Sequence, residues 1–201
     1  TREQLERELD WEIRHPVALV TFHPVTLEQG HAAAQVGCLL GAIREAGISA
    51  IFTGANADTE GRLITTLLTE FCQENPSRYL FFPSLGQLRY LSLLQVADLM
   101  IGNSSSGIIE APSFGLPVVN MGSRQAGRMT GKNVIQVPVD REKIVEGIRL
   151  ALSDAFRSQA GQADNPYARD YRAGWNIKEI LKNSELTPKT VIKGFYEGPI
   201  D

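Results

Sequence analysis

The sequence contains little cysteine, few aromatic residues and no strong charge of either sign. Only two of its 201 residues are cysteine, 7% are aromatic, and the formal net charge is −3. Cys38 and Cys72 are too few for a disulfide framework and lack the spacing of a metal site, so we expect a reducing, cytoplasmic setting without metal or cofactor. A weakly negative chain gives no electrostatic reason to expect nucleic acid as a partner.

Long apolar runs and an initiating methionine are also missing. No apolar stretch approaches the roughly 18 residues that a membrane span needs, so we expect no membrane partner. The chain begins at Thr1 and enters a charged segment directly, without the pattern of a signal peptide. We therefore expect this sequence to be part of a longer protein.

What the sequence does contain is a regular alternation of short apolar runs with longer helical stretches. The runs are almost entirely apolar, which predicts strands covered on both faces. We place strands at 17–22, 49–53, 79–82, 99–102, 117–121 and 134–137, and helices at 27–46, 59–74, 86–96, 105–114 and 141–153. Such repeated units predict an α/β fold with a Rossmann-like, doubly wound parallel sheet, whose ligands bind at the carboxyl ends of the strands.

The end of the chain does not follow this alternation. We expect residues 1–155 to form the Rossmann-like domain, with 1–14 as a leading helix. Residues 156–201 contain a polar stretch, a Pro-Tyr pair and a helical segment near 175–181. We interpret them as a C-terminal helical tail that packs on the domain, or on a neighbour outside this sequence.

The strongest local feature is a small, hydroxyl-rich turn after the fourth strand, with the sequence GNSSSGIIEAP. It opens a predicted helix, whose free N–H groups and partial positive charge suit a phosphate. Ser104 and Ser105 add hydroxyl donors, Gly107 allows close approach, and Glu110 can accept both hydroxyls of a ribose. The alternative is a serine cap with a glutamate favoured by the helix dipole, but three serines and a glycine exceed what a cap needs.

Polar residues after two other strands strengthen this interpretation. His23 follows the first strand, where it can donate to an anionic oxygen or act as acid or base near neutral pH. Arg124 and Arg128 follow the fifth strand in a glycine-punctuated loop typical of an anion clamp. A capping histidine and a solvated basic loop are the ordinary alternatives. His15 and His31 have no comparable placement, and we expect them at the surface.

Two further loops carry weaker signals. Asn56 follows the second strand in a turn rich in Asn, Asp and Gly, and its spacing alone favours an ordinary turn residue. Ser84 and Leu85 follow the third strand, where a flat loop can accept the edge of a nucleobase through backbone groups.

Taken in order, these motifs resemble the UDP-N-acetylglucosamine 2-epimerase family, and most closely its hydrolysing type in sialic acid synthesis. The resemblance covers about residues 15–155. Five sequence motifs carry it. They are Thr-x-His-Pro from Thr21, the tripeptide Asn-Ala-Asp from Asn56, GNSSSGIIEA from Gly102, FGLPVVN from Phe114 and GSRQxGR from Gly122.

The resemblance implies the C-terminal half of a GT-B architecture, in which the active site lies in the cleft with an N-terminal domain that is missing here. It implies UDP and UDP-N-acetylglucosamine as ligands. The implied reaction is anti-elimination of UDP to a 2-acetamidoglucal intermediate, followed by addition of water to give N-acetylmannosamine. Most acid/base carboxylates of the family belong to the N-terminal domain, so we expect this chain alone to be inactive. Family members are commonly dimers or larger, which implies a homo-oligomer.

The same resemblance assigns the diphosphate to the serine turn and the arginine loop. Ser104 and Ser105 would bind it at the helix start, and Arg124 and Arg128 would contact it from the loop. His23 would lie by the β-phosphate and help to stabilise the departing UDP, which makes it the expected catalytic residue.

The nucleoside and the sugar are assigned to the other loops. Glu110 would hold the ribose hydroxyls, the base would rest near Ser84 and Leu85, and Asn56 would line the sugar or phosphate side. Two alternatives stay open: a GT-B glycosyltransferase domain, which shares these features, and a non-catalytic nucleotide-binding module, which is favoured if the natural protein begins near Thr1.

Overall fold

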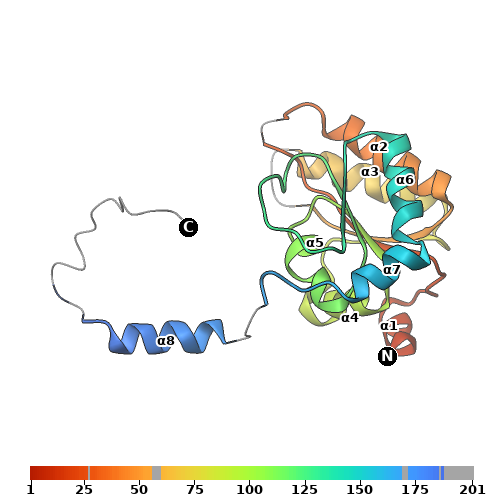
Figure 1. Ribbon diagram of the computed structural model, residues 1–201. Helices are drawn as coiled ribbons and strands as arrows, with labels where there is room; N and C mark the ends of the chain where they lie inside the picture. Colours follow the sequence, from red (N-terminus) through yellow and green to blue (C-terminus); the bar gives the residue numbers. More distant parts are fainter. Residues whose placement is uncertain (27, 56–59, 169–171, 186, 188–201) are drawn as a thin grey trace. The chain divides into compact units, whose positions relative to one another are not determined.

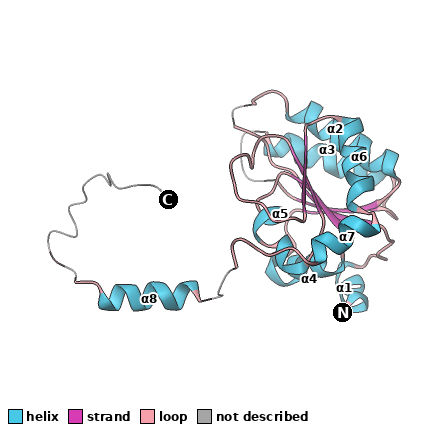
Figure 2. Cartoon of the chain, in the orientation of Figure 1, coloured by secondary structure: helices cyan, strands magenta, loops and turns pink. Residues whose placement is uncertain are grey.

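The computed structural model describes residues 1–26, 28–55, 60–168, 172–185 and 187. The chain divides into two compact units, Thr1–Tyr167 and Ala168–Asp201. The first unit contains a six-stranded sheet in which every neighbouring pair is parallel, with the order β3-β2-β1-β4-β5-β6 (Figure 2). The strands are β1 (Val17–Thr21), β2 (Ser49–Thr53), β3 (Tyr79–Phe82), β4 (Leu99–Gly102), β5 (Val118–Met121) and β6 (Val134–Val137).

Helices cover both faces of this sheet (Figure 1). One face carries α2 (Ala32–Ala46), α3 (Gly61–Glu74) and α6 (Arg141–Ala151). The opposite face carries α1 (Arg2–Leu9), α4 (Gly86–Val96), α5 (Ser106–Ile109) and the 3-10 helix η1 (Ala111–Phe114). Val20 belongs to the first core and its neighbour Leu19 to the second, because successive side chains of a strand point to opposite faces. Both faces of the sheet are therefore apolar, as predicted from strand sequences that do not alternate between apolar and polar residues.

The strand order places a switch point between β1 and β4. From β1 the chain proceeds outward through β2 and β3, and it then returns to β4 on the other side of β1. The loops that leave the two central strands lead to helices on opposite faces, which leaves a crevice at their carboxyl ends where ligands bind in such sheets. The predicted doubly wound parallel sheet is thus confirmed.

The helix predicted over 105–114 is wrong as a single element. The α-helical part ends at Ile109, and a 3-10 helix follows from Ala111 to Phe114. Pro112 has no N–H to donate to the preceding turn, and Gly115 ends the segment in the left-handed conformation at φ 61°. The helix after β4 is therefore one short turn.

The leading helix is also shorter than predicted, and one helix was not predicted. The leading helix ends at Leu9, where Asp10 adopts the left-handed conformation. Beyond α6, Ser153 accepts a hydrogen bond from the Phe156 amide and begins α7 (Asp154–Gly161), which contacts η1 and α6. The first unit therefore extends to Tyr167, later than the division expected after residue 155.

The second unit is described mainly by α8 (Ala173–Asn183), which agrees with the helix predicted near 175–181. It exposes the apolar side chains of Trp175, Ile177, Ile180 and Leu181. None of the helices among the described residues combines the length and the apolar character that crossing a membrane would need.

Candidate functional site

Asn103, the first residue after β4, joins the loops that follow three neighbouring strands. Its side chain is 1% exposed. Its Oδ1 accepts a hydrogen bond from the His23 amide at 2.7 Å, and its Nδ2 donates to the His23 carbonyl at 2.8 Å. Its own carbonyl accepts from Arg124 Nη1 at 3.2 Å and from Gln125 Nε2 at 2.8 Å. The predicted residues His23 and Arg124 are therefore held to the same strand end.

Gly102 makes this close arrangement of β1 and β4 possible. Its φ is 135°, and a Cβ at this position would lie 2.0 Å from the carbonyl oxygen of Thr21. The amide of the next residue, Asn103, donates to that same oxygen at 3.2 Å. A side chain at position 102 would therefore separate the two strand ends.

The serine turn begins directly after Asn103. Ser104 and Ser105 are half-buried, and Ser104 Oγ accepts a hydrogen bond from the Ser106 amide at 3.3 Å. Ser106 is buried, and its Oγ accepts from the Tyr90 hydroxyl at 2.7 Å. The first two serines are thus the accessible hydroxyls of the turn, whereas the third is used to hold α4 against α5.

Gly107 has a different role from the one that the sequence suggested. A Cβ at this position would lie 2.8 Å from Val118 Cγ1, so the glycine lets α5 pack closely on β5. The sequence predicts that the missing side chain leaves room for a ligand, whereas in the structure it leaves room for Val118 of β5. Because α5 is a single turn, its dipole is small, and an anion here would be held mainly by N–H and hydroxyl groups.

A pocket of about 550 Å³ lies beside the serine turn. It is lined by the ends of β2 and β3, by the start of α4 and by Glu110. The structure therefore brings together Ser84, Leu85 and Glu110, which the sequence placed on separate loops. Leu85 is buried, while Ser84 and Glu110 are exposed. The result is a cavity lined by both apolar and polar side chains, with the Glu110 carboxylate among them.

Tyr90 connects this pocket to the serine turn. It lines the cavity and donates its hydroxyl hydrogen to Ser106 Oγ. Burial raises the pKa of Tyr90 above its ordinary value, and the negative charge of Glu110 acts in the same direction. The phenol consequently stays protonated and keeps this hydrogen bond at neutral pH.

The other predicted residues have different outcomes. Arg128 is exposed in the loop that follows Arg124, and Asn56 lies outside the described residues. His31 is exposed, as expected. The His15 side chain is 40% exposed, and its Nδ1 lies 2.6 Å from Asp98 Oδ2 in a hydrogen bond. This pair lies at the amino end of β4, away from the serine turn.

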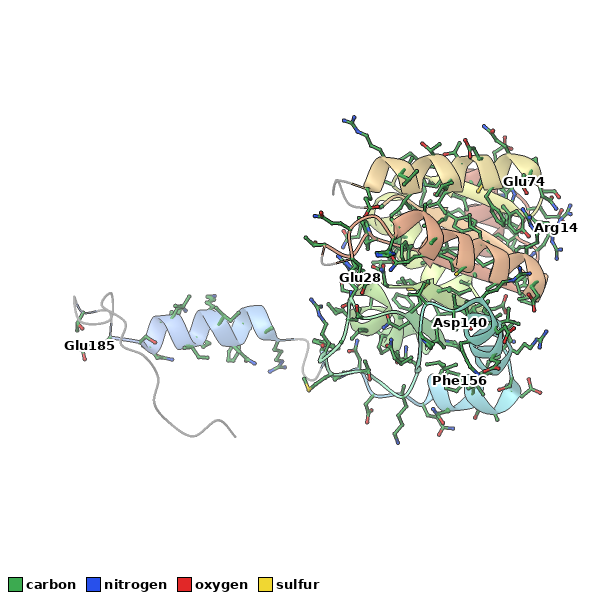
Figure 3. The ribbon with its side chains drawn as sticks, turned by 90° about the horizontal axis from the view of Figure 1, so that it is seen from above. Arg14, Glu28, Glu74, Asp140, Phe156 and Glu185 are labelled. Atoms are coloured by element: carbon green, nitrogen blue, oxygen red, sulfur yellow. The ribbon has the colours of Figure 1, made fainter. Side chains whose placement is uncertain are left out.

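Sequence reasoning assigned no role to three residues that organise the site. Asn103 and Gln125 lay within motifs but were treated as part of a turn and a loop. Glu28 was not considered, although its carboxylate accepts from Ser123 Oγ at 2.7 Å and from Gln35 Nε2 at 2.5 Å. It thereby links the loop after β1 to the loop after β5. Glu28 is labelled in Figure 3. Only Asn103 carried a positional signal, because it directly follows a buried strand.

Acidic, histidine and cysteine side chains do not gather into a metal site here. In the part of the chain that the structure describes, no group of three or more of them is placed to hold a metal ion.

Comparison with known proteins gives a consistent match. The family model described as UDP-N-acetylglucosamine 2-epimerase matches residues 1–182. The polysialic acid biosynthesis protein P7 of Escherichia coli is 37% identical over 183 residues, which are 90% of this chain and 46% of that protein. A hydrolyzing GDP/UDP-N,N'-diacetylbacillosamine 2-epimerase of Campylobacter jejuni is 36% identical over 92% of this chain and 48% of its own length. The chain thus spans about half the length of these relatives.

A solved structure has the same fold. It is the UDP-GlcNAc 2-epimerase of Methanocaldococcus jannaschii in complex with UDP-GlcNAc and UDP, and it aligns with a TM-score of 0.67 and 17% identity. The alignment covers 90% of this chain and 49% of that structure. The six-stranded domain therefore corresponds to one half of a two-domain architecture.

Proposed function

Because the chain belongs to the UDP-N-acetylglucosamine 2-epimerase family, we propose that it is the nucleotide-binding half of such an enzyme. The family and the fold expected from the sequence are thereby confirmed. The observation that carries the proposal is that a pocket lined by Glu110 and Tyr90 lies beside the serine turn, which begins directly after the strand end where Asn103 holds His23 and Arg124.

The pocket suits the nucleoside of UDP. A flat base fits against the apolar walls near Ser84 and Leu85, with backbone groups at its edge. Glu110 lines the same pocket, and its carboxylate can accept hydrogen bonds from both ribose hydroxyls. Tyr90 spans from this cavity to Ser106, so the next groups of the ligand, the phosphates, reach the serine turn.

The strand ends suit the diphosphate. Ser104 and Ser105 offer hydroxyl donors at the turn, and Arg124 supplies a half-buried positive charge beside it. Arg128 adds exposed positive charge in the same loop. His23, after β1, stabilises the charge that develops on the departing β-phosphate.

In the longer protein, we propose a hydrolysing reaction. The C1–O bond to UDP breaks as a proton leaves C2, which gives UDP and 2-acetamidoglucal. Water then adds across the double bond with inversion at C2, which gives N-acetylmannosamine. The hydrolyzing relative of 36% identity supports this outcome over re-addition of UDP. The remaining acid/base groups come from a second domain, so this chain by itself releases no sugar.

The setting of the whole enzyme follows from the same family. We propose a cytoplasmic homo-oligomer in which the second domain of each subunit closes over the nucleotide. Neither metal nor organic cofactor is needed for the elimination as written, because proton transfer and departure of UDP account for every bond.

A ligand titration tests the proposal. UDP, GDP, UDP-N-acetylglucosamine and uridine are added separately to the 201-residue chain, with calorimetry and heteronuclear NMR as readouts. We expect micromolar to millimolar dissociation constants for the uridine diphosphates, with shifts at Ser104, Ser105, Glu110 and Arg124. Preference for GDP would overturn the choice of nucleotide, and shifts confined to other residues would overturn the site. Release of N-acetylmannosamine by this chain alone would contradict the need for a second domain.

A further inference from the structure

We propose that Asn103 is the positioning residue of this site, and that it sets His23 and Arg124 in the arrangement that recognises a diphosphate. This inference rests on the proposed function, because it concerns how the phosphate end of the same site is held. It goes further than that function in one respect. It states that the Asn103 side chain strengthens the binding of the diphosphate, although it need not touch the ligand.

The contacts of Asn103 with His23 replace a missing part of the sheet. The parallel ladder between β1 and β4 ends at Thr21 and Gly102. Two residues later, both backbone groups of His23 are bonded to one amide side chain, at 2.7 and 2.8 Å. This two-point attachment fixes the orientation of the His23 backbone, and with it the direction in which the imidazole leaves the chain.

The carbonyl of Asn103 holds the opposite side of the site. It accepts hydrogen bonds from the side chains of Arg124 and Gln125, which both come from the loop after β5. His23 and Arg124 are thus attached to the side chain and the backbone of the same residue. Because that residue is 1% exposed, the frame is shielded from water and its geometry is pre-set before a ligand arrives.

An amide is the side chain that this position requires. The His23 amide needs an acceptor and the His23 carbonyl needs a donor, and the Asn side chain supplies one of each. An ionised carboxylate of the same shape would place a second acceptor against the His23 carbonyl oxygen, where no hydrogen bond could form. It would also introduce a negative charge at the end of the strand where the phosphates bind.

The test uses this difference between an amide and a carboxyl group. Wild type, Asn103→Asp and Asn103→Ser are titrated with UDP and with uridine at about pH 8 and about pH 5.5. Near pH 8, we expect both substitutions to weaken UDP binding by about tenfold and uridine binding by less than about twofold, since the nucleoside pocket is separate. Because position 103 is 1% exposed, burial should raise the pKa of the introduced carboxyl group above its ordinary value, so that near pH 5.5 it regains a proton and can donate to the His23 carbonyl. The UDP affinity of Asn103→Asp then returns to within about twofold of wild type measured at the same pH, while Asn103→Ser stays weak.

A matched control separates positioning from general support of the fold. Asn133 is another fully buried amide, and its Nδ2 donates to the Leu116 carbonyl at 2.9 Å. Asn133→Ser should lower the melting temperature but leave UDP affinity unchanged. In the ligand-free protein, the His23 amide should exchange with solvent about tenfold faster in Asn103→Ser than in wild type, because it loses a buried acceptor.

The outcomes distinguish the two proposals. If wild type binds UDP and the Asn103 variants bind it equally well, the positioning role is overturned and the proposed function stands. Equal losses of UDP and uridine affinity in Asn103→Ser would assign Asn103 a structural role only and overturn the inference. If wild type binds no UDP, the proposed function fails, and this inference fails with it.

Discussion

The two ends of β4 are each organised by one buried residue, but with opposite chemistry. Asp98 immediately precedes the strand and is 8% exposed, whereas Asn103 immediately follows it and is 1% exposed. The Asp98 carboxylate accepts from the Val17 amide at 2.8 Å, pairs with Arg157 at 2.5 Å and bonds His15 at 2.6 Å. Among the described residues, the Asn103 side-chain amide bonds to backbone groups alone, the N–H and C=O of His23.

The difference shows how charge is distributed along one strand. At the amino end, a carboxylate ties β1 and α7 to β4, and its charge is balanced by the Arg157 guanidinium. At the carboxyl end, where a diphosphate is proposed to bind, the same linking role falls to a neutral amide. Figure 3 shows Arg14, which precedes β1, and Glu28, which follows it, on opposite sides of the first unit. We infer that the first end contributes stability and the second contributes ligand geometry.

The largest effect on stability should come from removing the Asp98 carboxylate at the amino end of β4. Asp98→Ala leaves the buried Val17 amide without its acceptor and removes the partner of Arg157, so the free energy of unfolding should fall by about 2–3 kcal/mol. Urea unfolding measures this loss. Calorimetry on the folded variant should give a UDP dissociation constant within about twofold of wild type. Asp98→Asn is the control, because it keeps an acceptor for Val17 and should lose less stability. Unchanged stability with weakened UDP binding would reverse the comparison.

The opposite pattern is expected for Arg124. Arg124→Ala removes a charge next to the serine turn and should weaken UDP binding by about tenfold at low ionic strength, with a smaller ratio in high salt. Its unfolding free energy should change by less than about 0.5 kcal/mol, since the side chain is partly exposed. Arg128→Ala, in the same loop but exposed, provides the matched control and should have a weaker effect. A dissociation constant that does not respond to Arg124→Ala would exclude it from the site.

A substitution at Glu110 separates ribose binding from base binding at the ligand-binding end. Glu110→Gln should weaken uridine and UDP by about fivefold each, because a carboxylate accepts two hydroxyl hydrogens and an amide oxygen does so less strongly. Binding of uracil alone should not change. Competition titrations with the three ligands measure the ratios, and a similar loss for uracil would contradict the ribose role.

The effect that is smallest at neutral pH concerns the core, away from both ends of β4, and it develops only in alkaline solution. Burial raises the pKa of Cys72 from its ordinary 9.0 to about 12. In the unfolded chain the thiol ionises at the lower value, so the unfolded state loses a proton that the folded state retains, and stability falls as pH rises from about 9 towards 12. Cys72→Ala should flatten this decline in urea titrations at alkaline pH. An unaltered slope would mean that the thiol titrates normally in the folded protein.

The sheet was predictable from the sequence because it depends on local patterns. Four of the six strands have the predicted bounds, since a short apolar run between turn residues is a strong signal. The break after Ile109 was missed although Pro112 and Gly115 carry signals that interrupt or end a helix. The helix from Asp154 to Gly161 was missed because its segment is largely polar, although Ser153 carried a capping signal.

The strand ends were predictable as locations, but their internal connections were not. A parallel sheet gathers the residues that follow its strands, so His23, Ser104 and Arg124 could be grouped in advance. The bonds between Asn103 and His23 join residues 80 positions apart. Nothing in the local sequence distinguishes an amide that makes such bonds from an ordinary turn residue. The same holds for Asp98, whose partners Val17 and Arg157 are distant in the chain.

A crystal structure of the chain with UDP tests the central claim most directly. The account predicts electron density for the diphosphate at Ser104 and Ser105 with Arg124 in contact, and for the ribose at Glu110. It also predicts that the two bonds between Asn103 and His23 are the same with and without ligand. A diphosphate bound away from the serine turn, while that turn carries only solvent, would contradict the account.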